Sequence, residues 1–299
     1  MLKSKSTIYG VAMSLCFPLF TKAQTLVNGF YPQKNKLTIA TSYAYKTSDR
    51  FYRGTTLTEG NPANLGEISS SIFSVYADYG INDWLSAVVS LPYISLKSEE
   101  GTVDPVHKKS EVSGLQDVSL FMKARVLNKN FDEGSKLSIG TAAGISFPMS
   151  NYEGNGILSI GNKATTFDGV VVMQYTMPFN LFFEGQTGYS IRSNSDFKIP
   201  NALLYSLKLG YYNEWIYAHA KLGGQDSTSG YDIGSAEFGA NGGPVALSQT
   251  QVDYTTLHFD VYVPVYKQSF GVSAGYGFAI DGRNFSKEKA FSIGLVYKN

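Results

Sequence analysis

Histidine is the residue of this chain best suited to acid–base chemistry near neutral pH, and it occurs at His107, His219 and His258. A serine-type hydrolase needs a histidine that activates a nearby serine, with a third group that orients the ring. His219 and His258 fall on neighbouring predicted strands, but neither has a serine two residues away on its own strand face. The chain also lacks a Walker loop, a His-Glu-x-x-His motif and a pair of cysteines. We therefore expect no enzyme, no cofactor and no metal site; a lipid-modifying enzyme that uses a serine from an adjacent strand is the least favoured alternative.

A second group of residues suits a polar path, because its charged and amide side chains share one face of alternating strands. Its members are Lys123, Arg125, Glu184, Gln186, Arg192, Lys208, His219, Lys221, His258 and Asp260. If consecutive strands pair through their connections, Glu184 lies close to Lys208, and Lys208 in turn lies close to His219. Such a ring of mixed charge could line a narrow pathway or bind a ligand. Alternatively, the same groups neutralise one another inside a filled barrel, since an unpaired buried charge is costly.

The elements that position these residues are two-sided strands, in which apolar and polar residues alternate with period two. In the last strand, for example, Phe291, Ile293 and Leu295 share one face, and Ser292 and Gly294 share the other. We count about twelve such strands, each long enough to cross a bilayer at a tilt. Their predicted spans are 35–46, 68–79, 84–96, 115–127, 135–147, 166–176, 181–192, 201–212, 215–224, 250–263, 268–279 and 290–298.

The connections between these strands alternate between short and long. The short ones lie at 80–83, 177–180, 213–214 and 264–267, with one of middling length at 128–134. The long polar ones lie at 47–67, 97–114, 149–165, 225–249 and 280–289, with a shorter one at 193–200. Outer-membrane barrels have short periplasmic turns and longer external loops, and aromatic residues at both interfaces. Tyr43, Tyr45 and Tyr189 stand at such strand ends. The pattern therefore predicts an all-β transmembrane antiparallel β-barrel whose apolar face, including Leu120, meets lipid.

The N-terminus has the layout of a secretory signal peptide. Lys3 and Lys5 precede a short apolar stretch at 8–20, and a small-x-small cleavage site ends at Ala23. We expect residues 1–23 to be cleaved and residues 24–299 to form one barrel domain. The only cysteine, Cys16, lies in the leader, so the mature chain has no disulfide. Loss of three lysines and no acids changes the net charge from +1 to about −2, which leaves no basic stripe for nucleic acid.

Only about ten residues of the mature chain precede Asn35, too few for a plug domain. This argues against an energy-coupled receptor. A lumen plug, if present, is expected to be an infolded loop such as 225–249, which is rich in Gly and Ser. The charges in the other long loops suit a solvated face or contact with lipopolysaccharide, and their spacing supports no specific calcium site.

Three segments resemble recurring motifs of one family of bacterial outer-membrane proteins. They are YGINDWLS at 79–86, which runs on to SLPY at 90–93, SGLQDVSL at 113–120 and SDRFYRG at 48–54. The family is named for the MetA pathway of phenol degradation. The resemblance implies an outer-membrane β-barrel related to channels for hydrophobic compounds, and it does not imply that this chain handles phenols. The chain ends in Tyr297-Lys298-Asn299 and not in a terminal Phe, so we expect the barrel-assembly machinery to read Tyr297.

We thus expect a barrel in the bacterial outer membrane that passively takes up or exports small molecules, including hydrophobic or aromatic ones. Its partners would be outer-membrane lipid and lipopolysaccharide, the solute, and the barrel-assembly machinery. The alternative from another class is a structural or surface-binding barrel whose external loops contact a ligand or partner.

Overall fold

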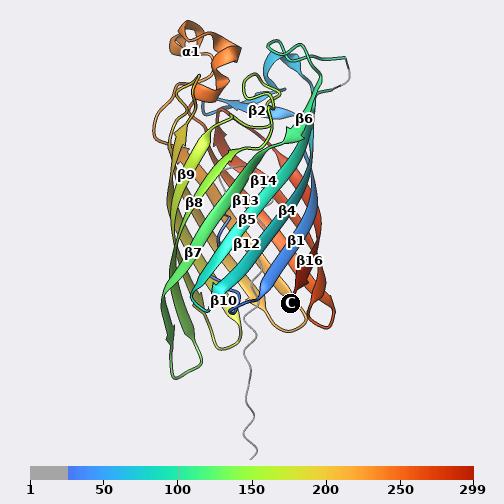
Figure 1. The fold of residues 1–299 in the computed structure, drawn as a ribbon. Helices are drawn as coiled ribbons and strands as arrows, with labels where there is room; N and C mark the ends of the chain where they lie inside the picture. The colour runs from blue at the N-terminus through green and yellow to red at the C-terminus, as the bar shows by residue number, and fades with distance from the viewer. Residues whose placement is uncertain (1–25, 100) are drawn as a thin grey trace, which may run out of the picture.

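A computed structural model describes residues 26–99 and 101–299, so the predicted leader lies outside the described residues. Twelve antiparallel strands form a closed barrel in which each strand pairs with its neighbours in the sequence (Figure 1). They are β1 (Leu37–Ser48), β4 (Ile68–Asn82), β5 (Leu85–Lys97), β7 (Asp117–Asn130), β8 (Lys136–Pro148), β9 (Thr165–Thr176), β10 (Leu181–Ser193), β11 (Ala202–Tyr212), β12 (Tyr217–Ser227), β13 (Asp253–Tyr266), β14 (Phe270–Arg283) and β16 (Lys289–Lys298). The barrel closes where β1 pairs with both β4 and β16.

Two predicted boundaries are wrong, for local reasons. The predicted strand 115–127 is longer and interrupted, because β6 (Glu111–Leu115) pairs with the outer end of β5 and only Gln116 separates it from β7. The predicted turn at 264–267 lies instead at 267–269. Pro264 remains inside β13, where the register shifts between Pro264 and Tyr266. A proline is tolerated at such a bulge because the local ladder needs no N–H there.

The predicted facing of the strands is confirmed. Leu120 and Met122 are 43% and 45% exposed, whereas Phe121 and Lys123, which alternate with them, are buried. β16 shows the same arrangement, since Phe291 is exposed and Ser292 is buried. An apolar surface that surrounds the whole barrel would be costly in water and is what lipid requires.

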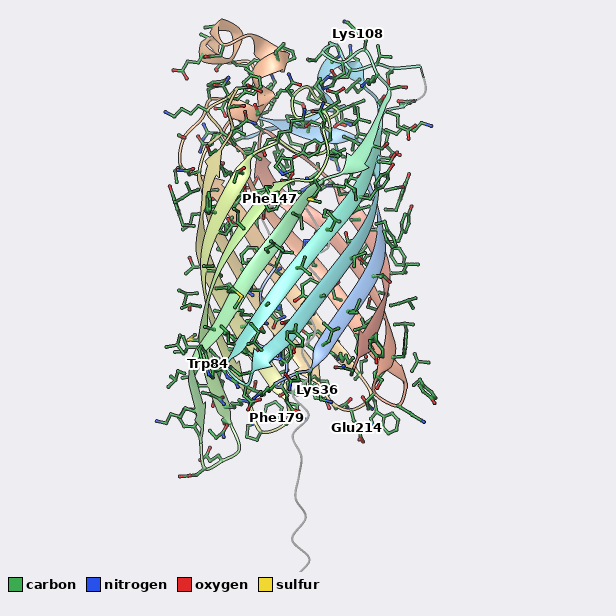
Figure 2. All side chains as sticks on the ribbon, viewed as in Figure 1. Lys36, Trp84, Lys108, Phe147, Phe179 and Glu214 are labelled. Atoms are coloured by element: carbon green, nitrogen blue, oxygen red, sulfur yellow. The ribbon has the colours of Figure 1, made fainter. Side chains whose placement is uncertain are left out.

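The short turns lie at one end of the barrel and the long connections at the other. Figure 2 shows Lys36, Trp84, Phe179 and Glu214 near the short-turn end, opposite Lys108. The turn after β4 is closed by Asn82, whose Oδ1 accepts from the backbone N–H of Trp84 and Leu85 at 3.0 and 2.9 Å. Asn side chains favour such turns because they replace a backbone acceptor. The exposed Trp84 and Phe179 fit the aromatic belt expected at a membrane interface.

The long connections are folded, and they cap the other end of the barrel. A small sheet of β2 (Arg50–Arg53), β3 (Thr56–Glu59) and β15 (Phe285–Ser286) joins the first and last of these connections. The 3-10 helix η1 (Pro62–Asn64) follows β3, and helix α1 (Ala236–Ala240) and the 3-10 helix η2 (Gly243–Gln249) lie in the connection between β12 and β13 (Figure 1). Within the described residues, no helix has the length and apolar character needed to span a bilayer.

Candidate functional site

The described N-terminal segment, from Leu26 to Tyr31, lies inside the barrel and not outside it. Val27, Asn28 and Phe30 are each no more than 5% exposed. The backbone N–H of Gly29 donates to Glu184 Oε2 at 2.9 Å, and Gln186 Nε2 donates to Val27 O at 3.0 Å. This short segment, which we call the N-terminal plug (residues 26–31), therefore fills the lumen near the short-turn end.

Aromatic packing and one lysine hold the plug from the other sides. The ring of Phe30 contacts those of Phe182, Tyr212 and Tyr217 edge to face, at centroid distances of 5.3, 5.7 and 6.0 Å. Lys123 Nζ donates to Phe30 O at 2.7 Å. Edge-to-face ring pairs contribute beyond the apolar area they bury, so this cluster stabilises the plug independently of its polar contacts.

The expectation that a loop such as 225–249 would form any plug is therefore wrong for the described residues. That expectation treated a plug as a folded domain, for which ten residues are too few. Inside a narrow barrel, six residues suffice, because the inward side chains of the strands fill most of the lumen. The signal in the sequence was the run of apolar and aromatic residues Leu26, Val27, Phe30 and Tyr31 just before the first strand.

The inward charges near the plug are paired with one another. Glu184 lies directly opposite Lys208 in the β10–β11 register, and their Oε1 and Nζ atoms are 2.7 Å apart, which confirms that prediction. Lys123 Nζ is 2.9 Å from Asp78 Oδ2. Lys208 lies opposite Lys221 across β11–β12, so His219, which we expected beside Lys208, takes a diagonal position.

The ten residues predicted from the sequence separate into four places. Lys123, Glu184, Gln186 and Lys208 surround the plug. His219, Lys221, His258 and Asp260 form a neighbouring group on β12 and β13, in which His219 Nε2 is 3.3 Å from Asp260 Oδ2. Arg125 lies at the short-turn rim, where it donates to Asp83 O and its guanidinium is 5.1 Å from the ring centre of Tyr31. Arg192 alone reaches the large cavity described next.

A cavity of about 440 Å³ lies beyond the plug, with Leu26 at its boundary. Its wall combines hydroxyl groups from β4, β5, β7, β8 and β9 with apolar side chains. The hydroxyl residues on these strands are Ser70, Ser74, Ser90, Ser119, Ser146 and Thr166. The apolar ones include Ile72, Ile94, Phe121, Leu204 and Tyr254. Sequence reasoning missed this apolar group, although each member interrupts the polar face of its strand and could have been found on that basis.

Folded connections cover the cavity on the side of the long loops. The connection at 149–164 contributes Ser159, Ile160 and Gly161 to the wall. Asp104, which is fully buried, fastens that connection to the preceding one, because its carboxylate accepts from the backbone N–H of Ile157 and Leu158 at 2.6 and 2.7 Å. Tyr152 donates to Asp117 Oδ1 at 2.6 Å, and burial together with that carboxylate raises the pKa of Tyr152.

A second cavity, of about 330 Å³, lies among the loops and shares part of its wall with the first. The shared residues include Lys46, Ser70, Leu96 and Phe285. The two cavities are therefore neighbours, one among the loops and one inside the barrel, and the N-terminal plug bounds the second at Leu26.

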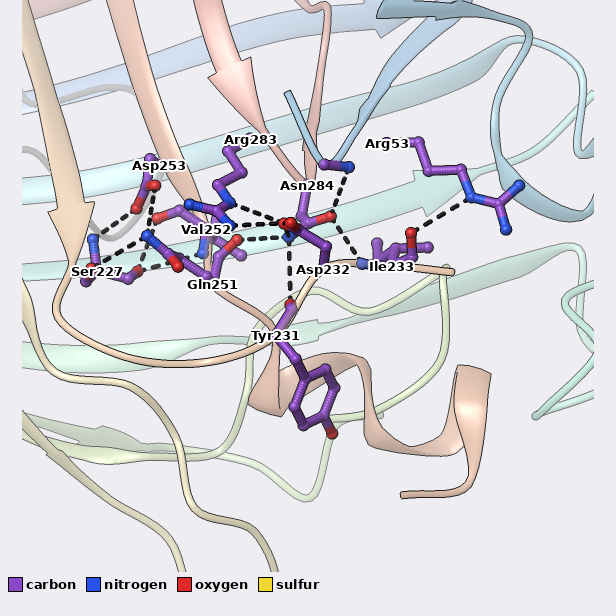
Figure 3. A network of polar contacts seen from close by, with 11 residues as sticks. Arg53, Ser227, Tyr231, Asp232, Ile233, Gln251, Val252, Asp253, Arg283 and Asn284 are labelled. Carbon is purple, nitrogen blue, oxygen red and sulfur yellow. Dashed lines mark hydrogen bonds and ion pairs between the residues drawn. The ribbon is translucent and has the colours of Figure 1, made fainter. Parts of the chain in front are cut away.

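A polar network fastens the connection that carries α1 to the barrel rim (Figure 3). Asn284 Oδ1 accepts from the backbone N–H of Gly54 and Ile233, both at 3.0 Å, and its Nδ2 donates to Gln251 O at 2.7 Å. Arg283 Nε donates to Asp232 Oδ1 at 2.7 Å, and this bond holds the pKa of Asp232 below its ordinary value. One residue of β14 and one beyond it thus join three separate loop segments.

No cluster of His, Cys, Asp or Glu that could hold a metal ion is found among residues 26–99 and 101–299. The site is therefore a cavity with an apolar and hydroxyl wall, next to the paired charges that surround the plug. Together with the closed barrel and its outward apolar surface, these features define an outer-membrane β-barrel.

Comparison with known families gives a particular assignment within that class. The chain matches, over residues 68–295, the family described as "Putative MetA-pathway of phenol degradation", and it belongs to that family. The match extends through the second half of the chain, whereas the motifs recognised in the sequence lie in the first half, and the segment at 48–54 lies outside it. No curated protein matches the sequence.

Among solved structures, the barrel is similar to the COG4313 outer membrane channel from Pseudomonas putida F1. That likeness has a TM-score of 0.71 at 13% identity and covers 90% of this chain and 97% of that one. The NanC porin gives a TM-score of 0.48 at 12% identity, with coverage of 87% and 98%. The CymD monoaromatic hydrocarbon channel gives 0.40 at 11% identity, with coverage of 90% and 89%. At 13% identity the first likeness establishes a shared barrel fold.

Proposed function

We propose that this protein is a passive outer-membrane channel for small molecules with apolar or aromatic parts. The observation that carries the proposal is the cavity of about 440 Å³ inside the barrel, whose wall mixes hydroxyl groups with Phe121, Leu204 and Tyr254. Such a wall suits a solute that is partly apolar and partly hydrogen-bonding, and the volume falls within the usual range of ligand sites. A wide water-filled porin would instead present a continuous polar lumen.

The family and the fold support this proposal. The similar barrel from Pseudomonas putida F1 is described as an outer membrane channel, and the family takes its description from phenol degradation. In this proposal, residues 1–23 direct export and are removed, and the barrel-assembly machinery inserts residues 24–299. The ten inward residues then act mainly in holding the plug and setting the charge of the pathway.

The test is planar-bilayer conductance of the purified, refolded mature chain, together with uptake of a soluble aromatic solute into liposomes. Discrete openings that the aromatic solute blocks, or solute uptake above that of protein-free liposomes, are the expected results. A folded barrel that neither conducts nor admits the solute would overturn the channel function. The heat-dependent gel shift of a folded barrel serves as the control for refolding.

The second candidate is a closed barrel that binds a ligand or partner through its external loops, lipopolysaccharide included. The observation that favours it is the order of those loops, which Asn284, Asp104 and the β2–β3–β15 sheet hold in place. Binding of lipopolysaccharide to the refolded barrel without any solute uptake would favour this candidate. For a lipid-modifying activity, His219 would have to activate a serine, and the ion pair that its Nε2 makes is with Asp260.

A further inference from the structure

Among the described residues, one cation in the wall of the large cavity makes no ion pair within 4.0 Å. Two basic residues line that cavity, Lys46 and Arg192. Lys46 Nζ is 2.6 Å from Glu288 Oε2. Arg192 donates from Nε to Ser190 Oγ at 3.2 Å and from Nη2 to Gln225 Oε1 at 2.7 Å, and both acceptors are neutral. Within the described parts of the chain, no carboxylate oxygen lies within 4.0 Å of its guanidinium.

A guanidinium in such a place is costly unless something compensates its charge. Arginine carries five N–H donors in a rigid planar fork, and the two hydrogen bonds above use only part of it. Asp168 lines the same cavity from β9 and attracts Arg192 electrostatically, but its carboxylate oxygens lie beyond 4.0 Å of the guanidinium and leave the remaining N–H donors unused. A partly buried cation that faces a cavity is therefore well placed to receive an anionic group of a ligand.

An apolar wall stands directly beside this cation. Gln225, which accepts from Arg192, is the register partner of Leu204 on β11 and of Tyr254 on β13. The ring of Tyr254 stacks on that of Phe285, with centroids 4.2 Å apart and planes inclined by 19°. The cavity thus places the guanidinium of Arg192 next to the flat aromatic surface of Tyr254 and Phe285.

We propose that this cavity binds aromatic monocarboxylates, with the carboxylate on Arg192 and the ring against Leu204, Tyr254 and Phe285. This inference rests on the proposed function and names the solute class of that cavity. A planar guanidinium matches a carboxylate through two parallel hydrogen bonds. The carboxylates of Asp117 and Asp168 lie in the same wall, so they would repel a second negative group and disfavour dicarboxylates.

Calorimetric titration of the refolded mature chain in lipid nanodiscs tests this proposal, with benzoate, its neutral analogue benzamide, and phthalate as probes. We expect benzoate to bind about tenfold or more tightly than benzamide, since hydrogen bonds to charged groups contribute more than neutral ones. Phthalate should bind more weakly than benzoate. Equal binding of benzoate and benzamide, or preferential binding of the cation benzylammonium, would overturn the proposal.

The variants separate the role of Arg192 from general charge effects. Arg192→Gln should reduce benzoate binding to the level of benzamide and leave benzamide binding unchanged. Arg192→Lys, which keeps the charge but loses the fork, should give an intermediate affinity. Lys289→Gln removes a charge from an exposed residue outside the cavity wall and should change neither affinity. The gel shift of a folded barrel shows whether Arg192→Gln is folded. A folded Arg192→Gln that keeps the preference for benzoate over benzamide would overturn the proposal. If Arg192→Gln does not fold, the affinity of Arg192→Lys for benzoate is the deciding result.

Failure of this inference and failure of the channel function give different results. If the barrel takes up neutral aromatic solutes and Arg192→Gln affects no solute, the channel function stands and the proposed preference for carboxylates fails. If benzoate binds in an Arg192-dependent way but the barrel shows neither conductance nor uptake, the preference for carboxylates stands and the channel function fails.

Discussion

At the scale of single residues, two kinds of inward side chain have different tasks. Glu184 is fully buried and receives hydrogen bonds from Lys208, Gln186 and the backbone of Gly29, so one carboxylate joins β10, β11 and the N-terminal plug. Gly29 is required at its position because an added Cβ would lie 2.7 Å from the Cβ of Gln174. Arg192 and its apolar neighbours, by contrast, are arranged toward open space and not toward the plug.

Replacing Glu184 by Gln should destabilise the barrel by about 3 kcal/mol, since it removes one partner of a buried ion pair and leaves the other charge in place. The free energy of unfolding in urea, followed by tryptophan fluorescence, measures this effect. Glu214→Gln, at an exposed turn residue, is the control and should be nearly neutral. A similar small effect for both variants would contradict a supporting role for Glu184.

Arg placed at Leu120 should destabilise the folded barrel by about 2–4 kcal/mol, because that side chain lies on the lipid-facing side of β7. Arg placed at the neighbouring Ser119, which lines the cavity, should have a much milder effect. Folding efficiency into liposomes and urea midpoints compare the two variants. Equal effects at both positions would be incompatible with the facing of β7.

At the scale of elements, the N-terminal plug is the part whose removal should change function most. It is held by the ring cluster of Phe30 and by hydrogen bonds to Glu184, Gln186 and Lys123, and none of these contacts belongs to the strand ladder. We therefore expect the strand ladder to persist when these contacts of the plug are removed.

Phe30→Ala should weaken the plug and raise single-channel conductance, because it removes three ring contacts at once. Channel recordings of the refolded variant measure this, and its heat-dependent gel shift should remain as in the wild type. Phe179→Ala, at an exposed turn residue, serves as the control. An unchanged conductance in Phe30→Ala would mean that the plug does not limit the pathway.

The loop that carries α1 should loosen in acid. The Arg283 hydrogen bond lowers the pKa of Asp232 below its ordinary value of 3.8. The ionised form is thus the one that the folded state favours, so its contribution is complete above pH 3.8 and is lost as the pH falls through the lowered pKa. A nitroxide label attached to Cys in an Ala240→Cys variant reports this in spin-resonance spectra. Its mobility should increase only when the pH falls below 3.8.

The matched control for this loop is Asp232→Asn in the same labelled background. It should be mobile already at neutral pH and should show little further change in acid. Labelling is specific because Cys16, the only natural cysteine, lies in the predicted leader. Equal pH profiles in the two proteins would exclude Asp232 as the titrating group.

At the scale of the whole molecule, the barrel resembles Gram-negative outer-membrane channels, and its surface explains why a membrane is needed. Exposed apolar residues surround the cylinder, while the charges within its span, such as the Lys123–Asp78 and Lys208–Glu184 pairs, face the lumen. The mature protein should therefore fractionate with the outer membrane and migrate differently in gels before and after heating. Recovery in the soluble periplasm would contradict the architecture.

Much of this architecture follows from the sequence, because strand alternation and turn composition are local properties. Leu120, Met122 and Phe291 have the facing that period two predicts, and the Glu184–Lys208 contact follows once two neighbouring strands pair in register. Two predictions were less accurate: the end of the strand at Pro264 and the segment that would form a plug. Pro264 continued its strand at a bulge, and a six-residue N-terminal segment occupies part of the lumen, where an infolded loop was expected.

By itself, the sequence thus determined the strand number, the facing of each strand, the sorting of turns and loops, and the family resemblance. Only the tertiary structure decided what occupies the lumen and which inward residues line an open cavity. The physical reason is that closure of the barrel brings together side chains from β4 to β13 that no local pattern connects. The space left between them is what admits the N-terminal plug at one end and leaves Arg192 facing a cavity at the other.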